Sequence, residues 1–569
     1  MPIRLINTET LQMSFFSNSK LQGYAVLSHT WVEDEEVSFQ EMCQIADNPD
    51  HEATRKSGYH KIVATCQKAK RRGIQYAWVD TCCIDKTSSA ELSEAINSMF
   101  RWYQDSQICF AYLADLSVSA SDTETALKNC RWFARGWCLQ ELLAPKVVAF
   151  YDESWNYRGS KSELKPTIAA ITGVDGDVLE DCSVMYSLPV ARRMSWASKR
   201  ITTREEDTAY CLLGIFDVNM PMLYGEGDKA FLRLQEEIIR RYNDTSIFCF
   251  SPPRTQPAIS NPNEEETILE LSKLRFCDMF AKSPADFADC GSMRHKPGSW
   301  VPFDRQATSL TNRGIQLGKQ TLYWTPRTGI QCFGWEVPYE LSQLDGKTPR
   351  NTDIFLRKIG RGLFVRVPAQ ISIPPSEKPK VAEDVCVLLH VNPSIHSQIH
   401  EALKKVIRIR IQNHQGTRTE ISGQVPRESW DESTSQFLVP DATEFSGYVS
   451  IRAVVEGSED KHVFLGCSTG KGMYPYEPRV AIAQIGTKAP SGAEGYWSSG
   501  LWRFTLANSA SPTSFEVKLG SVRITANIVR GVDQDSGSEI YTCRVNVYNN
   551  VLLKLQREGA SNEKGKSWW

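Results

Sequence analysis

The segment RGWCLQELL, residues 135–143, combines one carboxylate with leucines at helical spacing. Because Leu139, Leu142 and Leu143 recur three and four positions apart, the segment predicts a helix with one apolar face. Glu141 lies off that face, beside several aromatic residues of the same stretch. A carboxylate on a rigid helix can stabilise positive charge that develops on a ligand. The alternative is a solvated helix residue, since charged helix residues usually face water.

Apolar stretches and amphipathic patterns alternate through the first 155 residues. Helical spacing of apolar residues is found over 59–69 and 92–103. This alternation predicts an α/β domain with a parallel sheet and right-handed crossovers. The predicted strands are YAVLS (24–28), YAWVD (76–80), QICFAYLAD (107–115) and KVVAFYD (146–152).

Polar side chains stand where the predicted strands end. In open α/β sheets, ligands bind beyond the carboxyl ends of the strands, near the point where the strand order reverses. Since Glu141 follows the third strand, we expect it to overhang the same edge. The other residues that arrive there are Ser28, His29, Trp31, Asp80 and Asp115.

Each of these residues also has a structural interpretation. A histidine at a strand end often makes a structural hydrogen bond, and Asp80 can cap its loop or the next helix. Trp31 and Trp137 can serve as core or lid residues.

Composition limits the classes of function. The 569 residues are too many for one core, and the apolar content of 41 % and charged content of 23 % are typical of globular proteins. With 65 Lys plus Arg against 67 Asp plus Glu, charge offers no case for nucleic acid or an anionic membrane. The sequence shows no signal peptide and no apolar run of about 18 residues, so we expect a cytoplasmic protein without a membrane span.

The cysteines favour a reducing compartment over a metal site. The chain has 16 Cys and nine His, but no C-x-x-C pair and no cluster of the two residue types. We therefore expect free thiols, no zinc and no other bound metal.

Four further regions follow the first domain of residues 1–155. Residues 156–250 form a helical extension, with a capping box at Thr203 and Glu206 and an amphipathic helix near 228–242. Residues 251–300 are predicted to be a linker and docking segment. Residues 301–556 contain short alternating strands that predict a β-rich, sandwich-like region, and residues 557–569 are predicted to be a mobile tail. The sequence GCSTGKGM (466–473) lacks the spacing of a phosphate-binding loop.

Three motifs carry a family resemblance. YAVLSHTW, YAWVDTCCID and RGWCLQELL resemble the three blocks of the fungal HET (heterokaryon incompatibility) domain, in the same order. The resemblance covers roughly residues 1–250. Proteins of this family trigger programmed cell death when genetically different fungal cells fuse. The resemblance implies a cell-death effector that self-associates and has an incompatibility partner protein.

HET domains in turn resemble TIR domains, which have a flavodoxin-like parallel sheet and in which a glutamate after the third strand is needed to cleave NAD. Plant TIR sequences carry W-C-L-x-E-L there, and this chain reads WCLQEL from Trp137 to Leu142. The resemblance implies that Glu141 is catalytic and that NAD is a substrate rather than a cofactor. Ser28, His29 and Asp80 would then contact the substrate, and Trp31 or Trp137 would stack on a planar ring.

The expected reaction is hydrolysis of NAD to nicotinamide and an ADP-ribose product. Nicotinamide leaves as a neutral molecule and needs no acid, so one carboxylate that stabilises an oxocarbenium-like ribose is sufficient. One alternative is a non-enzymatic signalling or oligomerisation module. Another is a nucleotide sensor that binds without turnover.

Overall fold

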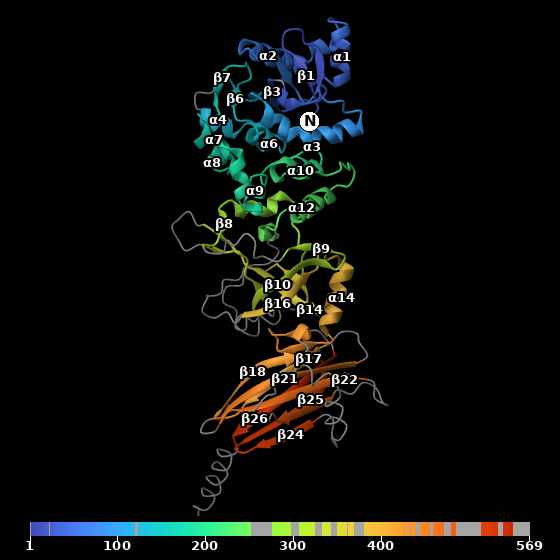
Figure 1. Ribbon diagram of the computed structural model, residues 1–569, viewed down its shortest axis with the longest axis vertical. Helices are drawn as coiled ribbons and strands as arrows, with labels where there is room; N and C mark the ends of the chain where they lie inside the picture. Colours follow the sequence, from blue (N-terminus) through green and yellow to red (C-terminus); the bar gives the residue numbers. More distant parts are fainter. Residues whose placement is uncertain are drawn as a thin grey trace, which may run out of the picture. The chain divides into compact units, whose positions relative to one another are not determined.

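The computed structural model describes seventeen stretches of the chain, and the statements below concern these stretches. They are 2–21, 23–119, 123–251, 276–297, 307–324, 333–342, 350–360, 362–368, 380–404, 406–425, 427–432, 434–439, 444–455, 459–470, 479–484, 514–532 and 539–549. The predicted tail, residues 557–569, lies outside them, as do residues 252–275 and 298–300 of the predicted linker and docking segment. The chain divides into two compact units (Figure 1), the first formed by residues 1–255, 280–310 and 337–353 and the second by the remainder.

A seven-stranded mixed sheet forms the centre of the first unit, in the order β2-β1-β4-β3-β5-β6-β7. Strands β4, β3, β5 and β6 are mutually parallel, which agrees with the four predicted strands. The bounds are β1 (Ile3–Asn7), β2 (Met13–Phe16), β3 (Tyr24–His29), β4 (Tyr76–Trp78), β5 (Ile108–Tyr112), β6 (Val148–Tyr151) and β7 (Tyr157–Ser160).

The prediction of a wholly parallel sheet is wrong at both edges. Strand β1 pairs antiparallel with β2 and β4, and β7 pairs antiparallel with β6. The connections explain two of these pairings, because only residues 8–12 join β1 to β2 and only residues 152–156 join β6 to β7. A parallel pairing needs a crossover of a dozen or more residues, whereas a short turn permits only an antiparallel partner.

Among the parallel strands, the first in sequence lies between the second and the third. This order places the reversal of strand order between β3 and β5, where a flavodoxin-like sheet binds its ligand. In register, Ser28 pairs with Ala111 and His29 with Tyr112. The carboxyl end of β3 therefore lies at the switch point.

Helices cover both faces of the sheet, with α1 and α2 on one side and α3 and α6 on the other (Figure 1). Ser38 forms a capping box with Glu41 at the start of α1, and Ser88 caps α3. These caps satisfy backbone donors that the helices leave free. The bounds are α1 (Phe39–Asp47), α2 (Ser57–Arg71), α3 (Ser89–Asp105), α4 (Thr123–Lys128), α5 (Arg131–Ala134) and α6 (Cys138–Leu143), with 3₁₀ turns η1 (Ser19–Leu21) and η2 (Glu52–Arg55).

Short helices follow β7 in the range of the predicted helical extension. The capping box expected at Thr203 is absent: α10 begins at Asp207, and the Glu206 carboxylate instead accepts the backbone N–H groups of Gly225 and Gly227. The bounds are α7 (Lys165–Thr172), α8 (Gly176–Glu180), η3 (Cys182–Ser187), α9 (Val190–Ser195), α10 (Asp207–Tyr210), α11 (Leu213–Phe216), α12 (Lys229–Arg241), η4 (Thr245–Phe248) and η5 (Pro284–Cys290). A small sheet of β13 (Arg350–Asn351), β12 (Tyr339–Leu341) and β8 (Met293–His295) completes the first unit.

The second unit is rich in β-structure, which confirms that part of the sequence prediction. One sheet has the order β11-β14-β15-β16-β10-β9. Its strands are β9 (Ser309–Thr311), β10 (Gly314–Trp324), β11 (Phe333–Trp335), β14 (Ile354–Gly360), β15 (Leu363–Val367) and β16 (Lys380–Val387), and α14 (Pro393–Lys404) follows.

Two further sheets of the second unit share one apolar core. Ile407, Val449, Val463, Ile524 and Val545, contributed by both sheets, are buried in a single cluster. This arrangement is a two-layer packing of β-sheets. The first sheet contains β19 (Trp430–Asp431), β20 (Gln436–Leu438), β17 (Val406–Asn413), β26 (Glu539–Asn549), β25 (Val522–Val532) and β24 (Ser514–Leu519), with η7 (Arg427–Ser429) beside it. The other contains β18 (Thr417–Val425), β21 (Glu444–Val455), β22 (Lys461–Gly470) and β23 (Arg479–Gln484).

Candidate functional site

Glu141 is a buried member of a short polar chain. It lies in α6 with 4 % of its surface exposed. Ser28, at the carboxyl end of β3, donates a hydrogen bond to Glu141 Oε2, and the Trp132 indole N–H donates to Ser28 Oγ at 2.7 Å. The structure therefore brings together two residues that the sequence places 113 positions apart. The alternative of a solvated glutamate is wrong, because every residue of α6 is buried.

Burial governs the protonation of Glu141. Loss of solvent raises the pKa of the carboxyl group, and the negative charge of Asp80 raises it further. The Ser28 hydrogen bond and the Arg135 charge act in the opposite direction, and the resulting pKa is about 7. Near neutral pH, Glu141 therefore exists in both its neutral and its ionised form.

Residues of the helical extension hold α6 in place. The Gly136 N–H bonds the Ile201 carbonyl at 2.9 Å, and the Arg200 guanidinium bonds the Arg135 carbonyl at 2.9 Å. At the other end, the buried Lys161 ammonium donates to the carbonyls of Leu142 and Pro145 at 3.1 and 2.5 Å. Lys161 thus satisfies one carbonyl in the last turn of α6 and one just beyond it, and the contacts at Arg135 and Gly136 hold the segment that leads into the helix.

His29 faces the acidic insertion that follows β3. Its Nε2 lies 3.4 Å from Glu36 Oε2, and Lys61 Nζ lies 2.5 Å from Glu36 Oε1. Burial works to raise the pKa of Glu36, but these two partners outweigh it and bring the pKa to about 2. Neither Glu36 nor Lys61 was predicted from the sequence as a site residue. Residues 33–37, EDEEV, contain several acids, but their pattern does not indicate which one turns inward.

Asp80 and Trp31 meet at the same edge of the sheet. Trp31 Nε1 donates to Asp80 Oδ2 at 3.0 Å, and the tryptophan is 40 % exposed. Two cations lie against its ring: Lys86 Nζ is 3.8 Å from the ring centroid and Arg135 Cζ is 5.0 Å from it. The capping role considered for Asp80 at the next helix belongs to Ser88.

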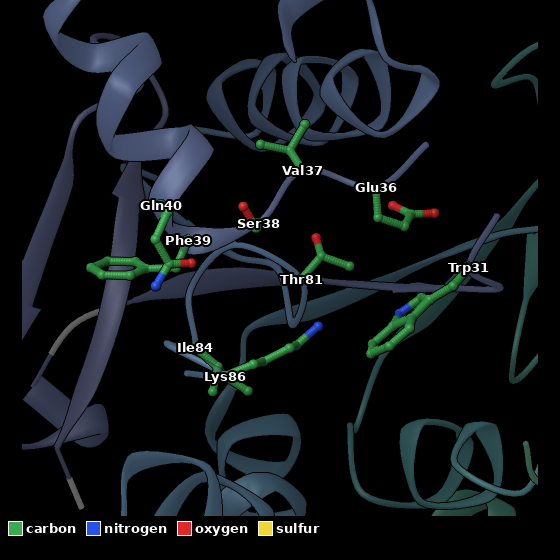
Figure 2. Close-up of a pocket in the computed structure, with 9 residues that line it drawn as sticks. All are labelled: Trp31, Glu36, Val37, Ser38, Phe39, Gln40, Thr81, Ile84 and Lys86. Atoms are coloured by element: carbon green, nitrogen blue, oxygen red, sulfur yellow. The ribbon is translucent and has the colours of Figure 1, made fainter. Parts of the chain in front are cut away.

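A cavity of about 140 Å³ opens beside Trp31, beyond the ends of β3 and β4 (Figure 2). Trp31 is the one predicted site residue that lines it; Glu141, Ser28, His29 and Asp80 do not. The lining residues are Trp31, Glu36, Val37, Ser38, Phe39, Gln40, Thr81, Ile84 and Lys86.

Two predicted residues have other partners. The Trp137 side chain hydrogen-bonds the Asp207 carboxylate in the helical extension. Asp115 accepts the backbone N–H of Arg131 at 2.9 Å and so supports the start of α5. These hydrogen bonds of Trp137 and Asp115 do not connect either residue to Glu141 or Ser28.

Metal-binding clusters and membrane-spanning helices are both absent from the described stretches. No three or more His, Cys, Asp or Glu side chains there are grouped so that they could hold a metal ion. Within the same stretches, no helix has the length and apolar character that crossing a membrane requires.

Residues 24–127, which extend from β3 into α4, match the family model described as heterokaryon incompatibility protein (HET). The match ends before α6 and Glu141. Residues 229–311 match a second family model, described only as a domain of unknown function.

A curated relative agrees with the first match. Over 229 residues, the chain is 45 % identical to vegetative incompatibility protein HET-E-1 from Podospora anserina, an alignment that covers 39 % of this chain and 16 % of that protein. The chain thus spans about a sixth of the length of this relative. Both comparisons support a relation to heterokaryon incompatibility proteins.

Among solved structures, the chain is similar to the Xerocomus chrysenteron lectin XCL, in its wild-type and mutated forms. Sequence identity is 13 %, the TM-score is 0.18, and the match covers 25 % of this chain and 96–97 % of the lectin. A TM-score this low carries no argument about fold or function.

Proposed function

We propose that this chain acts in heterokaryon incompatibility as a cell-death effector, and that its first unit hydrolyses NAD with Glu141 as the catalytic carboxylate. The match of residues 24–127 supports the biological role. The observation that carries the enzymatic role is the position of Glu141, hydrogen-bonded to Ser28 where strand β3 ends at the switch point of the sheet.

The chemistry requires little from the protein beyond one negative charge. The bond between the ribose C1′ and the nicotinamide nitrogen breaks, and its electron pair leaves with the nicotinamide, which becomes neutral. Water then adds to C1′ and releases a proton, which yields ADP-ribose. An ionised Glu141 stabilises the positive ribose, and exclusion of water around the carboxylate strengthens that effect.

The buried state of Glu141 sets one requirement for this reaction. With 4 % of the residue exposed, the ribose contacts the carboxylate only after the Ser28 hydrogen bond opens or a neighbouring side chain moves. Trp31 and Asp80 link the cavity to Glu141. Trp31 lines the cavity and donates a hydrogen bond to Asp80, and the charge of Asp80 acts on Glu141. They are the side chains that a bound nucleotide would meet first.

The same burial favours a second candidate function. A carboxylate held by Ser28 inside the domain can act as a structural link, in which case the domain signals by self-association or through a partner protein. Cell death would then be independent of NAD cleavage. In the enzymatic function the carboxylate charge stabilises the ribose cation, whereas in the signalling function the carboxylate only holds Ser28.

The deciding experiment incubates the purified full chain with NAD and measures nicotinamide release. Glu141→Gln keeps the shape and removes the charge, and we expect it to lower the rate at least a hundredfold. Glu94→Gln, which removes an exposed carboxylate from α3, is the matched control and retains the rate. Assays over a range of protein concentrations test whether activity depends on assembly.

Cell killing by the same variants in a fungal host separates the two functions. If the wild-type chain releases no nicotinamide at any concentration, or if Glu141→Gln kills at wild-type potency, the enzymatic proposal fails. Loss of both release and killing in Glu141→Gln, with both retained in Glu94→Gln, supports it.

A further inference from the structure

The cavity beside Trp31 has room for one compact group. Its volume of about 140 Å³ is similar to that of the ~150 Å³ cavity in another protein that admits a benzene ring. A whole dinucleotide is far larger. A ligand that uses this cavity therefore places a single group in it and lies mostly outside.

The charges around the cavity are unequal. Glu36 is the acid that lines it, and this carboxylate already has Lys61 and His29 as partners. Lys86 lines it too, yet its ammonium has no hydrogen bond or ion pair with the described residues; it lies over the Trp31 ring at 3.8 Å. Among the lining residues, the charge available to a ligand is therefore the positive charge of Lys86. Burial lowers the pKa of this ammonium, and the negative charge of Asp80, whose carboxylate bonds Trp31, opposes that shift.

Thr81 adds a polar group without a partner. Its side chain is buried, with 2 % of the residue exposed, and its hydroxyl has no hydrogen-bond partner within the described stretches. Figure 2 shows the Thr81 hydroxyl and the Lys86 ammonium directed into the space bounded by Ser38, Glu36 and Trp31. A buried hydroxyl without a partner is costly, so a ligand oxygen that bonds it is favoured.

The loop that carries both residues is held firmly. The backbone N–H of Asp85 bonds Glu91 at 2.8 Å, and Gln40 donates to the Asp85 carboxylate at 2.7 Å. Ser88 caps the helix that follows. Little ordering of the loop is then needed when a ligand binds, which favours affinity.

We propose that Lys86 and Thr81 form a subsite for one phosphate group of a nucleotide, with Trp31 holding the Lys86 ammonium in position through a cation–π contact. A phosphate offers several acceptor oxygens and negative charge, which match an ammonium and a hydroxyl donor. This inference rests on the proposed function only in taking the ligand to be a nucleotide. It does not require that the ligand be cleaved.

Calorimetric titration of the full chain with ADP and with adenosine tests the subsite. The wild-type chain should bind ADP more tightly than adenosine, and added salt should weaken ADP binding. Lys86→Gln should weaken ADP binding at least tenfold, and Thr81→Val should weaken it several-fold. Neither substitution should change adenosine binding. Lys70→Gln, which removes an exposed ammonium from α2, is the matched control and leaves both unchanged.

Two results would overturn the subsite: equal binding of ADP and adenosine by the wild-type chain up to millimolar concentration, or an unchanged ADP-to-adenosine ratio in Lys86→Gln. Thermal melts establish that each variant is folded, and Lys86 is an exposed residue whose replacement should not prevent folding. The Glu141→Gln chain should still bind ADP in a Lys86-dependent way. If ADP binding depends on Lys86 but the wild-type chain releases no nicotinamide, the subsite is supported and NAD cleavage is rejected. If the wild-type chain releases nicotinamide but ADP binding does not depend on Lys86, NAD cleavage is supported and the subsite is rejected.

Discussion

The hydroxyl of Ser28 donates a hydrogen bond to the carboxylate of Glu141 and thereby ties the end of β3 to helix α6. Ser28 is fully buried, and its oxygen also accepts the Trp132 indole N–H at 2.7 Å. The ring of Trp132 packs edge-on against Phe133 and Phe150, so the polar chain ends in an aromatic cluster. Each of these polar groups is the hydrogen-bond partner of another. Loss of the Ser28 hydroxyl would therefore leave both the Trp132 N–H and the Glu141 carboxylate without this partner.

Ser28→Ala should therefore destabilise the first unit by about 1–3 kcal/mol, because the Trp132 N–H and the Glu141 carboxylate both lose a buried partner. Urea denaturation measures this change in the free energy of unfolding. Ser119→Ala, at an exposed loop position, is the control and should alter stability by less than about 0.5 kcal/mol. Equal stability of the two variants would show that the hydrogen bonds joining Trp132, Ser28 and Glu141 do not stabilise the first unit.

Replacement of Glu141 by glutamine should change how stability depends on pH. The folded-state pKa of about 7 lies above the value of 4.5 for a glutamate in water, so the folded chain retains a proton that the unfolded chain has lost between these values. Burial of Glu141 thus costs stability as pH rises from about 4.5 to 7, by about 3 kcal/mol in full. The glutamine of Glu141→Gln does not titrate. The stability of this variant relative to the wild type should therefore rise by about 3 kcal/mol between pH 4 and pH 8.

Thermal melts of both chains at several pH values provide the measurement, with Glu94→Gln as an exposed control that follows the wild type. Parallel curves for Glu141→Gln and the wild type would contradict a buried, titrating carboxyl group. The same titration bears on catalysis. Because the ionised form carries the proposed reaction, nicotinamide release should rise with pH through about 7.

The parallel strands and the meeting of Ser28 with Glu141 could be predicted from the sequence, and physical rules explain why. Short apolar stretches alternate with amphipathic helices, and the carboxyl ends of parallel strands share one edge. The edge strands β2 and β7 were not predicted. Their sequences, MSFF and YRGS, are too short for a period to be recognised, and β7 carries little apolar content.

Side-chain partners were harder to predict than elements. His29 stands at the predicted edge, but its direction depends on Glu36, one acid among several in a loop without periodicity. Lys86 gave no signal, because a lysine in a polar loop is ordinarily solvated; only the folded position of Trp31 makes it notable. Trp137 was selected because it belongs to the motif WCLQEL. Its partner Asp207 lies 70 residues further along the chain, in the helical extension. Local patterns do not encode such long-range pairs.

Gly136→Ala should disturb α6 through a steric conflict with the helical extension. A Cβ atom at this position would lie 2.6 Å from Thr202 Cγ2 and 3.2 Å from Cys211 Sγ. The Gly136 N–H also bonds the Ile201 carbonyl, so the backbone has little freedom to retreat. Overpacking of this kind costs about 1–3 kcal/mol, and the resulting shift of α6 should slow nicotinamide release as well.

A second substitution isolates the cause. Thr202→Ser removes the Cγ2 methyl group and keeps the hydroxyl that bonds the Arg204 carbonyl. Combined with Gly136→Ala, it should recover part of the lost stability, so that the two changes are not additive in urea denaturation. Gly176→Ala is the control, because its Cβ would meet only the flexible Lys165 side chain at 3.9 Å. Strict additivity of Gly136→Ala and Thr202→Ser would show that the methyl group is not what holds the glycine in place, and that α6 is positioned by Arg200 and Lys161 alone.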